Sequence, residues 1–169
     1  MSRYVLVYNR DDGTKYVRIA TRKRIARNYF CRIDEFIKRG TDFEYTKIER
    51  IPVTLGLPIE ANNNDITVNF IPDERYPERF NKEYTVKDEM KDYLVIGTVM
   101  YGDMILDEKT DGLINRTVTW EGGAGRPKIV VSSRYQDGME TDIKYAFIDG
   151  NLDKFYIWDA RKRLMNLYE

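Results

Sequence analysis

The sequence predicts an α+β fold: an N-terminal β-hairpin and an amphipathic helix, then a mainly antiparallel β-sheet and a short C-terminal helix. Within residues 21–38, apolar residues recur at three- and four-residue spacing, which is typical of an amphipathic helix. The later apolar runs are short and rich in β-branched and aromatic residues. Asp-Gly pairs at 111–112, 137–138 and 149–150 lie between such runs, as in a series of hairpins.

The first part of the chain reads as a ββαβ unit over residues 1–60. Residues 4–8 and 15–19 are β-prone, and the Asp-Asp-Gly-Thr stretch at 11–14 between them favours a turn. Thr21 is placed to cap the helix, which is expected to end before Gly40. A further strand is predicted over 43–51. The predicted helix face that packs on the sheet consists of Ile25, Ala26, Tyr29, Phe30, Ile33, Phe36 and Ile37.

Residues 61–169 read as a β-rich unit that packs with the first in one compact domain. Strands are expected over 66–71, 93–100, 104–106, 113–120, 129–132, 143–148 and 155–158. Short helices are a weaker expectation over 76–82 and 86–92. At the end of the chain, Asp159 is placed to cap a helix that contains Arg161, Lys162 and Arg163.

The amino-acid composition excludes several classes of catalytic and metal site. The chain has no histidine and one cysteine, Cys31, which excludes Ser-His and Cys-His nucleophile activation and a structural zinc site within it. A carboxylate site for a hard divalent ion, or acid-base work by lysine and carboxylate, remains available. We expect no cofactor and no bound metal.

Cytoplasmic residence is the expected location. No stretch approaches the roughly 20 apolar residues that span a bilayer, so no membrane partner is expected, and the N-terminus lacks the pattern of a secretory signal. A single cysteine also suits a reducing compartment.

The 28 basic and 28 acidic residues are unevenly distributed. Residues 1–50 hold 13 Lys or Arg and 7 Asp or Glu (13 − 7 = +6), and the remainder holds 15 and 21 (15 − 21 = −6). Arg22, Lys23, Arg24 and Arg27 fall where a helix dipole is positive, without local acidic partners. Their counter-charges are expected either from carboxylates, of this chain or a protein partner, or from the phosphates of a nucleic acid.

A second group of basic residues follows the Gly-rich stretch at 122–125. Arg126 and Lys128 lie at the end of this predicted hairpin loop and are further candidate anion contacts. The pI near 6.4 argues against a dedicated DNA-binding domain, for which a value above about 9 is typical.

An enzymatic alternative depends on one resemblance. Ile71-Pro72-Asp73, followed by Asp107-Glu108-Lys109 after an apolar strand, resembles the P-D and [D/E]-x-K elements of a metal-dependent nuclease fold. That resemblance implies that Asp73 and Asp107 bind magnesium and that Lys109 orients the attacking water, provided both elements lie on adjacent strands. Glu89-Met90-Lys91 matches the second element equally well.

The function expected first is a non-enzymatic binding or regulatory protein that docks on a nucleic acid or nucleoprotein through Arg22, Lys23, Arg24 and Arg27. Compact chains of this composition without a catalytic signature are common among phage and mobile-element inhibitors, including those that block host defence, so a host protein or nucleoprotein is the expected partner. The alternatives are the divalent-metal nuclease and a homo-oligomeric module that uses sheet edges and its 13 tyrosines for protein contact.

Overall fold

The computed structural model describes residues 1–73, 76, 80–122, 126–148 and 151–165, and within these the fold is almost entirely β. Thirteen strands form three sheets, and one short 3-10 turn, Asp88–Met90, interrupts them. The predicted α+β class is therefore wrong, because neither the 21–38 helix nor the C-terminal helix is present. No helix among the described residues has the length and apolarity to span a membrane.

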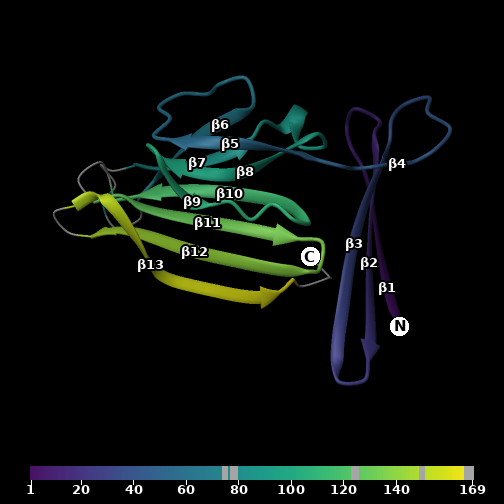
Figure 1. Ribbon diagram of the computed structural model, residues 1–169. Coiled ribbons are helices and arrows are strands. Elements are labelled where there is room, and N and C mark those ends of the chain that lie inside the picture. Colours follow the sequence, from purple (N-terminus) through teal and green to yellow (C-terminus); the bar gives the residue numbers. More distant parts are fainter. Residues whose placement is uncertain (74–75, 77–79, 123–125, 149–150, 166–169) are drawn as a thin grey trace.

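The N-terminal sheet replaces the predicted hairpin-helix unit. Its strand order is β1-β2-β3-β4, and its strands are β1 (Ser2–Asn9), β2 (Lys15–Ile25), β3 (Asn28–Lys38) and β4 (Thr46–Lys47). The predicted β1–β2 hairpin is confirmed, with Gly13 at a φ of 80° in its turn. We call β1, β2 and β3 the arm, because they form a long ribbon beside the rest of the molecule (Figure 1).

The predicted helix over 21–38 is instead the end of β2, a two-residue turn and all of β3. Lys15 to Ile25 pair with Lys38 to Asn28 without a register shift. The backbone N–H and C=O groups on this side of β2, which would be unpaired if β2 were an edge strand, therefore have partners in β3. In β3 the buried residues Ile33, Glu35 and Ile37 alternate with more exposed ones, which is the period of a strand. All the apolar residues assigned to the helix face except Ala26 are β-branched or aromatic types that strands favour.

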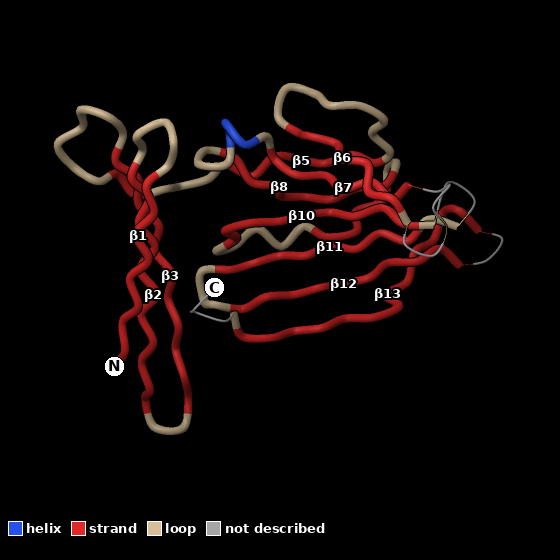
Figure 2. Tube along the Cα trace, turned by 180° about the vertical axis from the view of Figure 1, so that it is seen from behind, coloured by secondary structure: helices blue, strands red, loops and turns tan. Residues whose placement is uncertain are grey.

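The other two sheets pack face to face as a sandwich, which we call the body. The larger sheet has the order β13-β12-β11-β10-β7-β6, and the smaller has the order β5-β8-β9. Their strands are β5 (Ile51–Leu57), β6 (Ile66–Pro72), β7 (Phe80–Val86), β8 (Leu94–Tyr101), β9 (Met104–Asp107), β10 (Leu113–Glu121), β11 (Lys128–Tyr135), β12 (Met139–Ile148) and β13 (Asn151–Leu164). Figure 2 shows the two layers from behind.

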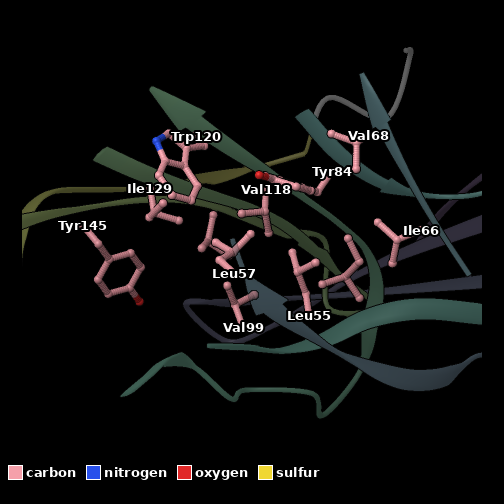
Figure 3. Packing of buried hydrophobic residues seen from close by; sticks show 12 residues of the cluster. Leu55, Leu57, Ile66, Val68, Tyr84, Val99, Val118, Trp120, Ile129 and Tyr145 are labelled. Atoms are coloured by element: carbon pink, nitrogen blue, oxygen red, sulfur yellow. The ribbon is translucent and has the colours of Figure 1, made fainter. Parts of the chain in front are cut away.

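Apolar side chains from both sheets fill the space between the layers (Figure 3). Leu55 and Val99 come from the small sheet and are completely buried, and they meet Tyr84 and Val118 of the large sheet. In β10 the buried positions Ile114, Arg116, Val118 and Trp120 alternate with exposed or half-buried ones. Sheet packing with one polar face therefore accounts for the alternating sequence of the central strands.

Each strand predicted over residues 61–169 overlaps an observed strand, but other predictions for this region are wrong. The Asp-Gly pairs at 111–112 and 137–138 do form turns with a positive φ at Gly112 and Gly138, whereas 149–150 lies outside the described residues. The short helices predicted over 76–82 and 86–92 are replaced by β7 and by the 3-10 turn, apart from the residues of 76–82 that fall outside the description. β5 runs parallel to β8, so hairpins do not account for every connection.

The prediction of a C-terminal helix is wrong, because β13 continues as a strand through Leu164. Its basic residues face acidic residues of β12 across the pair, with Arg163 opposite Glu140 and Arg161 opposite Asp142. Arg163 Nε donates to Glu140 Oε2 at 2.6 Å. Opposite charges on neighbouring strands stabilise such a pair, so the second Arg-Lys-Arg triplet has counter-charges within the sheet.

Candidate functional site

The basic residues singled out in the sequence lie at the distal end of the arm. Arg22, Lys23 and Arg24 are near the end of β2, and Arg27 is in the two-residue turn between Ile25 and Asn28. Figures 1 and 2 view the molecule from opposite sides, and in both this turn extends past the body. The helix dipole invoked for these cations does not exist, but the residues do lie together in space.

These four cations have no ion pair with any carboxylate in the part of the chain that the structure describes. Arg24 Nε donates to the carbonyl oxygen of Ala26 at 3.1 Å, and its guanidinium lies 5.5 Å from the ring centroid of Tyr29. By contrast, Arg161 of the second triplet is paired with Asp159 at 3.2 Å. Among the described residues, the first triplet therefore has no carboxylate in an ion pair with it, although Arg22 also hydrogen-bonds to the Cys31 thiol.

Large apolar side chains are exposed beside these charges. Tyr29 is 63%, Phe30 53% and Ile25 50% exposed, although the sequence analysis assigned all three to a buried helix face. In the hairpin, Arg24 is opposite Tyr29 and Lys23 is opposite Phe30. Because neighbouring pairs point to opposite faces, each face of the ribbon carries a cation beside an aromatic ring. We call Arg22–Phe30 the hairpin tip.

Two groups of ionic contacts fix the base of the arm to the body. Arg10 donates to Asp92 through Nη1 at 2.5 Å and through Nη2 at 2.9 Å. Buried Glu35 accepts hydrogen bonds from the Tyr16 hydroxyl and from Arg50 Nη1. Burial and the adjacent Glu35 carboxylate raise the pKa of Tyr16, so its hydroxyl stays protonated and available to donate.

Backbone contacts and a small apolar cluster attach the middle of the arm. The Ile33 N–H donates to the Gln136 carbonyl oxygen at 2.7 Å, and Ile33 packs with Ala20, Ile114 and Met165. A cleft of about 300 Å³ lies between arm and body. Its charged lining residues are Arg10, Arg18, Glu35, Arg50, Lys91, Asp92 and Arg134. Sequence reasoning missed this junction, because its partners come from segments far apart in the chain.

The structure does not bring Arg126 and Lys128 to the hairpin tip. Gln136, which contacts the arm, follows the C-terminal end of β11, whereas Lys128 begins that strand. Tyr135 is seven positions after Lys128, which corresponds to roughly 24 Å along a strand. Lys128 Nζ instead lies 5.0 Å from the ring centroid of Trp158. These two predicted binding residues belong to the opposite end of the body.

The two elements of the nuclease alternative are also separated, because Asp107 and Lys109 lie together but away from Asp73. Asp73 follows β6, which ends with the pair of Pro72 and Phe80. This end of the sheet lies beyond Trp120, which pairs with Lys82 of β7. Asp107 instead bonds to Arg116 Nη2 at 3.0 Å, and Arg116 precedes Trp120 by four residues on β10, in the direction away from Asp73. Lys109 Nζ lies 4.5 Å from the ring centroid of Tyr135. Among the described residues no group of three acidic or cysteine side chains is arranged to hold a metal ion.

The chain matches no known protein-family model, no curated protein and no solved structure with significance. The site is therefore defined by its geometry alone. That geometry is a projecting two-stranded ribbon with four cations that form no ion pair with the described residues, beside three exposed apolar side chains, an arrangement chemically suited to an anionic surface.

Proposed function

We propose that the protein is a non-enzymatic cytoplasmic binding protein that docks on a nucleic acid or nucleoprotein through the hairpin tip. The observation that supports this proposal most directly is the position of Arg22, Lys23, Arg24 and Arg27 at the end of a projecting ribbon, without an ion-pair partner in the described chain. A regulatory or inhibitory role, as in phage inhibitors of host defence, is the biological setting that we propose for such a protein.

The shape of the hairpin tip suits this partner. The major groove of duplex DNA, about 12 Å wide, admits a two-stranded β-ribbon. Lysine and arginine on the ribbon neutralise phosphates and release counterions, which gives affinity without sequence specificity. Exposed Tyr29 and Phe30 add surfaces on which unpaired bases can stack. A pI near 6.4 is compatible with this role, because the positive charge is concentrated at one end of the molecule.

The proposal is tested by reversing the charges of Lys23 and Arg27, whose side chains make no ion pair with the described part of the chain. We expect Lys23→Glu with Arg27→Glu to weaken binding to a fluorescently labelled DNA duplex at least tenfold at low salt, because two phosphate contacts become repulsive. The slope of log K against log salt concentration should also decrease by about two. Fluorescence anisotropy titrations at several salt concentrations, with duplex and single-stranded DNA, measure both quantities.

The second basic triplet supplies a control with the same change in net charge. Arg161→Glu with Lys162→Glu also removes two positive charges and adds two negative ones, but on β13, outside the hairpin tip. We expect this variant to bind nearly as the unmodified chain does. Equal losses in both double variants would show that only net charge matters, and unaltered binding by the folded tip variant would contradict the proposal.

A further inference from the structure

Strand β1 exposes a row of apolar side chains on a free sheet edge. It is the first strand in the order β1-β2-β3-β4, and among the described strands it pairs with β2 alone. Val5, Leu6, Val7 and Tyr8 are 58%, 46%, 59% and 57% exposed, so both faces of the strand are apolar. The edge lies on the side of the arm away from the body in both views (Figures 1 and 2). An open edge of this composition favours pairing with another strand.

The other five edge strands of the described sheets are protected. On β6 the Val68 N–H donates to the Asn62 side chain at 2.7 Å, so the preceding loop covers that edge. β5 contains Pro52, and β4 and β9 have only two and four residues. β13 carries three consecutive cations at 161–163 and two register shifts. Charges, proline, bulges and short length are the features that prevent edge pairing, and residues 4–8 have none of them.

The central sequence of β1 is palindromic, so two antiparallel copies of it are complementary. Residues 4–8 read Tyr-Val-Leu-Val-Tyr, which is the same in both directions. If two copies run antiparallel about a twofold axis at Leu6, Tyr4 faces Tyr8, Val5 faces Val7 and Leu6 faces Leu6. Arg3 then faces Asn9, so no two like charges are opposite each other. Aromatic and β-branched cross-strand pairs of this kind stabilise a sheet.

We propose that a second copy of this chain pairs with β1, in antiparallel orientation and with Leu6 on the twofold axis. The two N-terminal sheets then form one continuous sheet, and an isologous interface closes the free edge. Each body stays beside its own β3, outward from the joint, so it does not obstruct the pairing. This inference concerns β1 and is independent of the nucleic-acid proposal, which concerns Lys23, Arg27 and the rest of the hairpin tip.

Sedimentation equilibrium tests the dimer. We expect the unmodified chain to have the mass of two chains at high concentration and Leu6→Lys to have the mass of one, because two lysines then face each other on the axis. Ile105→Lys is the matched control, since Ile105 is 55% exposed on the edge strand β9 and should leave the dimer intact. Because the interface is apolar, the dimer should persist at high salt. A monomeric unmodified chain, or a dimeric Leu6→Lys chain, would overturn the proposal.

Disulfide trapping tests the register, in chains that carry Cys31→Ser. Directly opposite residues of an antiparallel pair have Cα atoms about 4.5 or 5.5 Å apart, which suits a disulfide. Under mild oxidation Leu6→Cys should therefore link to itself. Val5→Cys and Val7→Cys should each link poorly alone but readily when the two variants are mixed. Failure of Leu6→Cys to link, or equal linking of all three variants alone, would contradict pairing about Leu6.

Discussion

Arg116 shows at the scale of one residue how the body is held together. It is the largest fully buried side chain in the described chain, and its charge is shared among several acceptors. Nε donates to Ser133 Oγ at 2.9 Å and Nη2 to Asp107 Oδ1 at 3.0 Å, while Nη1 donates to the Gly97 carbonyl oxygen. Because these acceptors belong to both sheets of the sandwich, the guanidinium fixes their relative position. A buried charge is tolerated only with partners of this kind.

Removal of this guanidinium should therefore be costly. We expect Arg116→Met to lower the free energy of unfolding by about 3 to 5 kcal/mol, because the Asp107 carboxylate is left buried without its cation. Urea denaturation measures the difference. Arg161→Met is the control, since the Arg161 side chain is 74% exposed and its ion pair should contribute less than about 1 kcal/mol. A comparable loss in both variants would show that burial of Arg116 has no special role.

At the scale of elements, the turns and most strands after Asp65 were predictable, and the helices were not. Asp-Gly at 111–112 favours a turn through the preferences of its own two residues, and Gly112 does have a positive φ, so that signal is local. The segment 21–38 contains adjacent apolar pairs, such as Tyr29-Phe30 and Phe36-Ile37, that fit a helix face or two faces of a strand. Its pairing with β2 decides between them, and that contact is not local.

The candidate site was predictable in part for the same reason. The closeness of Arg22, Lys23, Arg24 and Arg27 follows from their spacing in the chain, whether the segment is helical or extended. Exposure of Phe30 does not, because it depends on how far the hairpin extends beyond the body. The junction partners Arg10 and Asp92 are 82 residues apart, so only the tertiary fold unites them.

The backbone of Ala26, in the turn of the hairpin tip, is in a strained conformation, and the strain can be tested by substitution. Ala26 has a φ of 54°, a conformation that costs an L-residue with a Cβ roughly 1 to 2 kcal/mol. We expect Ala26→Gly to raise the free energy of unfolding by up to about 1 kcal/mol, after the greater flexibility of glycine in the unfolded chain is subtracted. Ala160→Gly in β13 should lower it by about 0.5 to 1 kcal/mol. Urea unfolding of both variants provides the comparison, and changes of the same sign would contradict the role of φ.

At the scale of the whole molecule, the arm and body are joined by charged contacts. The hydrogen bonds from Arg10 hold the pKa of the Asp92 carboxyl below its ordinary value. A carboxyl with a lowered folded-state pKa stabilises the fold above its unfolded-state pKa, about 3.9, and that contribution disappears as the pH falls through the folded-state pKa. Acidification should therefore weaken the attachment of the arm.

We expect the free energy of unfolding to decrease as the pH falls from about 5 to about 2, and to decrease less for Asp92→Asn, which has no charge to lose. The variant should be less stable near neutral pH, and the difference from the unmodified chain should shrink toward low pH. Urea unfolding midpoints across this pH range measure the effect. Parallel pH profiles for the two chains would contradict a contribution from Asp92.

Arg10 and Glu35 attach the base of the arm to the body, and Ile33 attaches its middle. The hairpin tip extends beyond these contacts and is attached to the rest of the described chain at one end only. Its strands therefore gain little stability from the body, and opening of the tip does not require the sandwich to unfold. Local opening of this kind needs much less free energy than global unfolding. A tip that yields first can change its twist to follow a curved partner while Ile33 and the core behind it keep their packing.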